Sequence, residues 1–444
     1  MKKFLLTLLF LAVLLPLYAQ KPKYVFLMIG DGMAVPQRMI ADEFSRKLNR
    51  GQLAMNTLPF HATTRTASAS SLVTDSAAAA TAIACGEKTA NGVLGYSKDL
   101  SRKLESVAYV AHKNGKKVGI ITSVTINNAT PAGFYSCRKH RSLNYSIGLD
   151  LIASNFEYFA GGGVARCDDK KSPDYKGNIY DLAAKAGYKV VLNKADFLKL
   201  SRKDAKVLAS GVPGDLPAAI DNEESVPTLA EFTAKGIELL DNPNGFFMMV
   251  EGGRIDRFGH ANCAAENLHE VLAFDEAIKV VLGFAAKHPQ ETLVIVTGDH
   301  ETGGMTMGFA GSGYAMSMER LANQKISAIK FHEMMKNLKK KNPEFSFEAA
   351  CKLLTEYYGF RFDGSKKNPM KINAAEMKLL EKGFKKGKLA DSARVVMNGK
   401  AGIGWTTGKH TALPVLTTST GVKAELFSGF IDNTDIAKKL KTVL

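Results

Sequence analysis

The chain has 444 residues, 45% of them hydrophobic, and a formal net charge of +16 at pH 7. The hydrophobic content supports a large folded core, and the positive charge should attract anions to the surface. Basic residues are spread along the chain apart from one dense run at 336–341, without an aromatic platform or a recognition-helix motif. This distribution argues against a stable nucleic-acid partner.

The N-terminus has the form of a secretory signal peptide. Two lysines precede an apolar run over residues 4–17, and a Tyr-Ala-Gln segment follows, which predicts cleavage after Ala19. A membrane anchor needs about 20 apolar residues, and neither this run nor any later one reaches that length. We therefore expect residues 1–19 to be a signal peptide and residues 20–444 to form one domain, periplasmic or secreted, without a membrane anchor.

The cysteines lack the CxxC or CxxxxC spacing that is typical of a structural zinc knuckle. Because their number is odd, at least one thiol should stay free or pair with another chain. They are Cys85, Cys137, Cys167, Cys263 and Cys351.

Short apolar runs alternate with helix-like segments along the chain. Such alternation predicts an α/β fold with a mainly parallel central sheet and helices on both of its faces. Ligands of such sheets bind at the carboxyl ends of the strands. The expected buried strands are Tyr24–Ile29, Val118–Thr122, Lys189–Leu192, Phe246–Val250, Leu293–Thr297 and Pro414–Thr418.

The segment Val73–Ala82 places a serine beside a carboxylate at the start of an alanine-rich run that should be a helix. A helix N-terminus offers unpaired N–H groups and the positive end of the macrodipole, which would stabilise a phosphoryl group on Ser76. Ser76 is therefore the candidate nucleophile. The alternative is that Ser76 only caps the helix, as serines often do.

Two segments differ in character from the alternating pattern. Met305–Thr406 contains lysine-rich, helix-like stretches, and we interpret it as an insertion that decorates the core, with the option that it covers the site as a lid. Cys167–Pro227 is polar and interrupted, which predicts surface loops with a strand near Lys189–Leu192.

Carboxylates and histidines follow several of the expected strands directly. Single histidines are more often structural than metal-binding, but their shared position at strand ends predicts a metal centre. Zinc accepts histidine nitrogen and aspartate oxygen, whereas magnesium prefers oxygen ligands, so the mixture fits zinc ions with a neighbouring magnesium. The candidates are Asp31, Glu251, Asp256, His260, Asp299, His300 and His410.

Six motifs between positions 29 and 410 stand in the order found in the alkaline phosphatase family, which the chain closely resembles. The resemblance implies a three-layer α/β sandwich with a lid- or crown-like insertion, and a site holding two Zn²⁺ and one Mg²⁺. It also implies hydrolysis of small phosphate monoesters to an alcohol and inorganic phosphate through a phosphoserine. The motifs are Ile29–Met33, Thr74–Ala78, Asn128–Gly133, Val250–His260, Thr297–Gly304 and Thr407–His410.

The resemblance also implies individual roles. Ser76 would be the nucleophile that is phosphorylated, and Arg141 would clamp the phosphate, with Asp75 orienting it through an ion pair. Arg138 lies close enough in the sequence to be a rival for that role. The first zinc would take Asp256, His260 and His410, the second Asp31, Asp299 and His300, and the magnesium Asp31, Thr130 and Glu251.

Three positions near these residues leave alternatives open. Asn128 stands where family members commonly have Asp or His, and we expect it to hydrogen-bond a magnesium-bound water and to hold magnesium less tightly. The alternative is a plain loop asparagine. Arg257 and Lys409 either reach the phosphate, through water in the case of Arg257, or face solvent. Members of the family occur as dimers and as monomers, so a homodimer is also open.

Other functions fit the sequence less well. Phosphodiesterases and phosphonate hydrolases of the same superfamily usually use threonine as the nucleophile and lack the arginine clamp and the magnesium ligands. Sulfatases need a modifiable motif that the residues around Ser76 do not provide. An exported binding protein without catalysis would usually lack the nucleophile or a ligand, and none is missing.

Overall fold

The computed structural model describes residues 21–363 and 368–444. The predicted signal peptide, residues 1–19, lies outside the described residues. Within the described ranges, none of the helices is long and apolar enough to cross a membrane.

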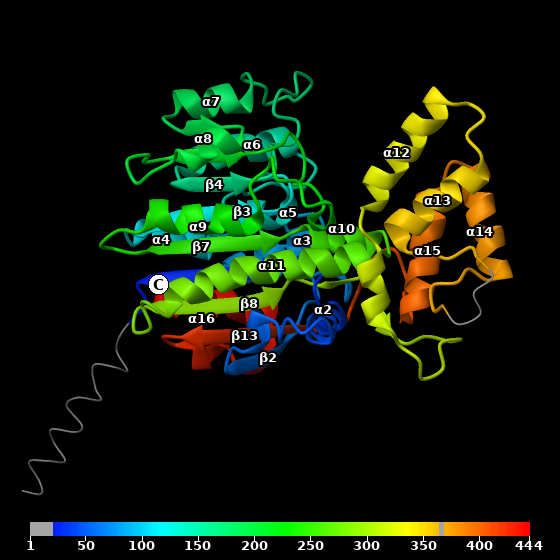
Figure 1. The fold of residues 1–444 in the computed structure, drawn as a ribbon. Coiled ribbons are helices and arrows are strands. Elements are labelled where there is room, and N and C mark those ends of the chain that lie inside the picture. The colour runs from blue at the N-terminus through cyan, green and yellow to red at the C-terminus, as the bar shows by residue number, and fades with distance from the viewer. Residues whose placement is uncertain (1–20, 364–367) are drawn as a thin grey trace, which may run out of the picture.

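A ten-stranded sheet runs through the molecule (Figure 1) in the order β14-β2-β13-β8-β1-β7-β3-β4-β6-β5. Only β13 runs antiparallel to its neighbours, which confirms the prediction of a mainly parallel sheet. The strands of this sheet are β1 (Tyr24–Gly30), β2 (Phe60–Arg65), β3 (Lys117–Thr122), β4 (Tyr158–Gly161), β5 (Lys189–Val191), β6 (Val207–Ser210), β7 (Phe246–Gly252), β8 (Thr292–Gly298), β13 (Val415–Gly421) and β14 (Gly429–Asp432).

Both faces of the sheet are covered. In β1, every residue is buried, and successive side chains point to opposite faces. Tyr24, Phe26 and Met28 join one hydrophobic cluster, whereas Val25 and Leu27 join another. A strand that is apolar throughout therefore requires helices on both sides, which gives the three layers.

The helices divide between the two faces. Side chains of α2, α9 and α11 pack in the cluster that contains Phe26, and those of α3, α4, α6 and α16 pack in the cluster that contains Leu27. The helices outside the insertion are α2 (Val35–Lys47), α3 (Ser76–Cys85), α4 (Val107–Lys113), α5 (Ala129–Ala132), α6 (Asn144–Ser154), α7 (Ile179–Lys185), α8 (Lys194–Leu198), α9 (Leu229–Leu240), α10 (Arg254–His260), α11 (Ala264–Ala285) and α16 (Asn433–Val443), with 3₁₀ turns η1 (Ala54–Asn56), η2 (Ala219–Asp221) and η4 (Ala424–Phe427).

All six expected strands are present, and four strands of the sheet were not predicted. Of these, β4, β6 and β14 have only four residues each, too few to show a period. The fourth, β2, has the largely polar sequence FHATTR. The expectation that Cys167–Pro227 forms surface loops with one strand near Lys189–Leu192 is incomplete: the strand is present as β5, and the segment also contains α7, α8 and β6.

The segment Met305–Thr406 forms a group of helices beside one end of the sheet (Figure 1). Its ends meet where Met307 pairs with Ile403 between two short antiparallel strands. Its buried side chains, such as Phe331 and Leu354, belong to the same hydrophobic cluster as those of α2 and α11. The division of residues 20–444 into one domain with an insertion stays a prediction. The insertion contains β10 (Thr306–Met307), η3 (Met318–Asn323), α12 (Ala328–Lys341), α13 (Phe347–Tyr358), α14 (Ala374–Lys385), α15 (Leu389–Ala401) and β11 (Ile403–Gly404).

The five cysteines all lie in the described part of the chain, and all are free thiols there. Cys85 and Cys263 are buried, and the other three are partly exposed. Burial raises the pKa of the Cys85 thiol to about 12, so this side chain behaves as a small apolar residue.

Candidate active site

Three adjacent strands, β8, β1 and β7, bring the candidate ligands together. Gly30 at the end of β1 lies opposite Gly298 on one side and Gly252 on the other. Asp31 and Asp299 therefore leave the sheet at the same level. The carboxyl edge of a parallel sheet thus gathers residues that are far apart in the sequence.

Asp31, Asp299 and His300 form the more deeply buried group, and their ligand atoms lie within 4.8 Å of one another. Nε2 of His300 is 3.3 Å from Oδ1 of Asp31 and 3.2 Å from Oδ2 of Asp299. Neither of these two oxygens has a hydrogen-bond partner among the described residues. Burial, reinforced by repulsion from Asp299, raises the pKa of Asp31, and burial also raises that of Asp299. A bound cation would offset both the burial of these carboxylates and the repulsion between them.

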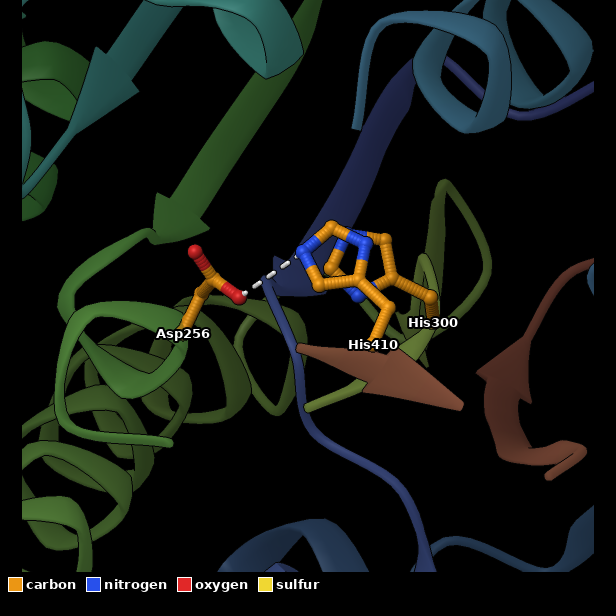
Figure 2. A group of neighbouring side chains, drawn as sticks. All are labelled: Asp256, His300 and His410. Atoms are coloured by element: carbon orange, nitrogen blue, oxygen red, sulfur yellow. Dashed lines mark ion pairs between the residues drawn. The ribbon is translucent and has the colours of Figure 1, made fainter. Parts of the chain in front are cut away.

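Asp256, His300 and His410 form the second group (Figure 2), and their ligand atoms also lie within 4.8 Å of one another. Nε2 of His410 is 3.4 Å from Oδ1 of Asp256. The ring of His410 stacks on that of His300 with centroids 3.7 Å apart. Although burial opposes it, contacts with His260 and His410 hold the pKa of Asp256 well below its usual range.

His260 stands beside this second group. Its Nε2 is 3.1 Å from Nε2 of His410 and 3.4 Å from Oδ2 of Asp256. The Nδ1 atoms of the two histidines face backbone carbonyls, those of Gly408 and Thr74, at 2.8 Å each. A carbonyl only accepts, so each Nδ1 carries a proton and, in the neutral ring, each Nε2 is left free to bind a metal.

The oxygen ligands predicted for magnesium meet on the other side of Asp31. The hydroxyl of Thr130, on α5, donates to Oδ2 of Asp31 at 3.4 Å. Glu251 on β7 is fully buried; its Oε2 accepts a hydrogen bond from Thr122, and its Oε1 has no partner among the described residues. Burial raises the pKa of Glu251. An unpartnered carboxylate oxygen in an all-oxygen neighbourhood suits a hard cation.

Ser76 is the first residue of α3, and its hydroxyl lies 3.2 Å from Nε2 of His300. The cap of this helix is Asp75, whose side chain accepts from Ala78 N at 3.0 Å. The alternative that Ser76 serves as the helix cap is therefore wrong. The Ser76 hydroxyl is free to face the histidine that belongs to both groups.

Arg141 is positioned by two side chains. Its Nη1 lies 3.1 Å from Oδ2 of Asp75, and its Nη2 donates to Oδ1 of Asn128 at 3.3 Å. The expected ion pair with Asp75 is thus present. Arg138, the rival candidate, is instead paired with Asp150 at 2.6 Å.

These side chains surround an open pocket of about 460 Å³. None of its lining residues in the described chain comes from the insertion, so the idea that the insertion acts as a lid stays a prediction. The pocket is lined by Val73, Thr74, Ser76, Asn91, Arg141, Asp256, Arg257, His260, Lys409 and His410.

Comparison with known proteins shows to which family this chain belongs. The family model described as "Alkaline phosphatase" matches residues 22–444. The chain belongs to the alkaline phosphatase family. The enzyme is therefore a phosphomonoesterase of a metal-dependent family, as the sequence motifs implied.

Relatives match this alkaline phosphatase over most of its length. Alkaline phosphatase 3 of Bacillus subtilis (strain 168) is 32% identical, over 94% of this chain and 88% of the relative. Alkaline phosphatase 4 of the same strain is 31% identical, over 84% of this chain and 77% of the relative.

Among solved structures, the cold-active alkaline phosphatase from Shewanella sp. matches with a TM-score of 0.82 and 28% identity, over 95% of this chain and 99% of that chain. The alkaline phosphatase of Thermus thermophilus matches with a TM-score of 0.80 and 26% identity, over 96% of this chain and 92% of that chain. A mutant of the TAB5 alkaline phosphatase, with a TM-score of 0.68, 26% identity and coverage of 96% and 98%, has Mg bound in its M3 site.

Several residues that support the site of this alkaline phosphatase were not found from the sequence. Thr302 donates a hydrogen bond to Asp256 at 2.5 Å and also lies near His300. Oδ1 of Asn91 accepts from the backbone of Asp75 at 3.2 Å. Thr302 lies inside the motif Thr297–Gly304, so its sequence position could have indicated a role at the site. Asn91 lies outside all six motifs, so the sequence did not indicate it.

Proposed function

We propose that this alkaline phosphatase hydrolyses phosphate monoesters through a phosphoserine formed on Ser76. The observation that supports this most directly is the 3.2 Å separation between the Ser76 hydroxyl and Nε2 of His300, a residue of both candidate metal groups. Ser76 also stands at the N-terminus of α3, where unpaired N–H groups favour a phosphoryl group.

We further propose that the site holds two Zn²⁺ and one Mg²⁺. The unpartnered oxygens of Asp31, Asp299 and Glu251 support two of these cation sites, and the clustering of Asp256, His300 and His410 supports the third. When bound, the ions would favour deprotonation of the serine hydroxyl and stabilise charge on the leaving oxygen. Asp256, His260 and His410 would hold one zinc, Asp31, Asp299 and His300 the other, and Asp31, Thr130 and Glu251 the magnesium.

Arg141 would bind two oxygens of the phosphoryl group. A guanidinium presents parallel N–H groups in a rigid fork that matches phosphate geometry. Its contacts with Asp75 and Asn128 support this role, because they orient the fork before the substrate enters. The magnesium-water role of Asn128 stays a prediction, since its Oδ1 already accepts from Arg141 and from the N–H of Ala129.

The substrates would be small phosphate monoesters, and the enzyme would act in the periplasm or outside the cell. The cationic rim of the pocket supports anionic substrates. The form of residues 1–19 and the bacterial relatives support export. A homodimer stays a prediction.

The test compares p-nitrophenyl phosphate with bis-p-nitrophenyl phosphate, with Zn²⁺ and Mg²⁺ and after EDTA. We expect strong monoesterase turnover that EDTA and Ser76→Ala abolish, whereas Ser225→Ala, at an exposed serine outside the pocket, keeps it. Preference for the diester would move the chain to the phosphodiesterase branch. Undiminished turnover in Ser76→Ala would contradict the phosphoserine.

A further inference from the structure

Two arginines and one lysine line the pocket, and these three side chains differ in their partners. Arg141 is paired with Asp75 at 3.1 Å, and Arg257 with Asp215, also at 3.1 Å. Lys409 is exposed, and across residues 21–363 and 368–444 its ammonium group forms neither an ion pair nor a hydrogen bond. Of these three side chains, Lys409 is therefore the one whose charge has no carboxylate partner among the described residues.

The backbone at Lys409 is held firmly although its side chain is exposed. Its carbonyl accepts from the N–H of Gly303 at 2.8 Å, and its own N–H donates to the hydroxyl of Thr407 at 3.1 Å. The next residue, His410, pairs with Thr302 between the short strands β9 (Glu301–Thr302) and β12 (His410–Thr411). The backbone of Lys409 is thus held in place next to His410, whereas its exposed side chain extends into solvent.

The depth of the pocket decides where a leaving group can lie. Ser76 is only 2% exposed and stands at the base, whereas Lys409 is exposed at the mouth. In an in-line displacement, the leaving oxygen lies opposite the attacking oxygen. A phosphoryl group in contact with Ser76 therefore directs the rest of the ester outward, to the mouth of the pocket, where Lys409 is one of the exposed lining residues.

We propose that Lys409 recognises the leaving group, so that the enzyme prefers phosphate monoesters whose alcohol carries a second anionic group, such as a carboxylate. This inference rests on the proposed function and adds the substrate class to it. Arg141 is already assigned to the phosphoryl group, and Arg257 is paired with Asp215.

The expected effect is modest because the contact lies in solvent. Ion pairs at exposed positions typically change affinity by about two- to fivefold, and salt weakens them. The contact is the same before and during phosphoryl transfer, so the effect should appear in KM rather than in kcat.

The experiment compares 4-carboxyphenyl phosphate with 4-carbamoylphenyl phosphate, a neutral ester of nearly the same shape. We expect Lys409→Gln to lower the ratio of their kcat/KM values about two- to fivefold, chiefly through KM. Lys409→Glu should lower it further, and Lys409→Arg should keep it. Lys352→Ala, at an exposed lysine on α13, is the control and should leave the ratio unchanged. In the wild type, 1 M NaCl should reduce the ratio.

Two failures are distinguishable. If the variants release phosphate from both esters with an unchanged ratio, the leaving-group role of Lys409 is overturned. If the wild type releases no phosphate from either ester with Zn²⁺ and Mg²⁺ present, the proposed function fails first.

Discussion

Asp75 serves two parts of the site with one carboxylate. Its Oδ1 accepts from Ala78 N and caps α3, whereas its Oδ2 is paired with Nη1 of Arg141. The residue that caps the helix of Ser76 therefore also orients Arg141, the proposed phosphate-binding arginine. This coupling holds Ser76 and Arg141 in a fixed relation, as the proposed roles of nucleophile and phosphate-binding group require.

Asp75→Asn should separate these two roles. Asparagine caps helices about as well as aspartate, so we expect the Tm to stay close to that of the wild type. Loss of the ion pair should weaken inhibition by inorganic phosphate about fivefold, or about 1 kcal/mol. Asp75→Ala, which also removes the cap, should lower the Tm. Wild-type phosphate inhibition in Asp75→Asn would show that the pair does not orient Arg141.

Glu270 on α11 should make stability depend on pH. It is 5% exposed, accepts from Ala219 N at 2.9 Å and lies 3.5 Å from Nε of Arg254. Burial outweighs the attraction of Arg254 and raises the pKa of Glu270 from 4.5 to about 7. The folded state then binds more protons than the unfolded state between these values, so this group lowers stability as the pH rises from 4.5 to 7.

Glu270→Gln removes that titration and keeps the acceptor for Ala219 N. We expect the free energy of unfolding of the wild type, relative to the variant, to fall by up to about 3 kcal/mol as the pH rises from 4.5 to 7. Urea unfolding at several pH values measures this difference. A difference that stays constant with pH would mean that Glu270 keeps an ordinary pKa in the fold.

At the scale of elements, α3, which begins at Ser76, packs closely against α5, which contains Thr130. All ten residues of α3 are buried, and most are alanine, so the helix has little side-chain bulk. A Cβ placed on Gly133, at the end of α5, would lie 2.8 Å from Cβ of Ala80. The alanine-rich run that predicted a helix is thus also needed for tight packing.

Gly133→Ala should force α3 and α5 apart. Overpacking of this kind costs about 1–3 kcal/mol, and we expect a lower Tm and lower activity because the site loses its geometry. Gly399→Ala is the matched control: Gly399 lies in α15, and outside its own helix no atom of the described residues lies within 4 Å of the added Cβ. That change should raise stability by up to about 1 kcal/mol. Equal Tm values for Gly133→Ala and the wild type would refute the packing constraint.

At the scale of the whole molecule, the sheet concentrates negative charge that the fold does not neutralise by itself. Asp31, Glu251 and Asp299 are buried at adjacent strand ends, and each keeps an oxygen without a hydrogen-bond partner in the described chain. Burial of uncompensated charge is costly, so bound cations should stabilise the native state.

Metal removal should therefore destabilise the protein as well as inactivate it. We expect EDTA to lower the Tm at pH 8 and re-addition of Zn²⁺ and Mg²⁺ to restore it, because ions that bind only the native state stabilise it by mass action. In Asp299→Ala the shift on adding Zn²⁺ should shrink. A Tm that is indifferent to EDTA and to added ions would argue against the proposed cation sites.

The sequence predicted the sheet, and it predicted that several candidate ligands gather at one edge of it, for a physical reason. Apolar runs that end in charged residues mark the carboxyl edge of a parallel sheet, so Asp31 and Asp299 could be placed together without coordinates. Contacts made by side chains between distant segments could not be predicted. Arg257 pairs with Asp215, which lies in a segment interpreted as loops, and His300 joins both metal groups because its ring lies against that of His410.

The central claim is that Ser76 is phosphorylated during turnover, and intact-protein mass spectrometry after acid quench tests it most directly. With Zn²⁺, Mg²⁺ and p-nitrophenyl phosphate present, we expect the mass of one added phosphoryl group, located on Ser76 by peptide mapping and absent from Ser76→Ala. A phosphoryl group on another residue, or turnover by Ser76→Ala without any adduct, would contradict the account.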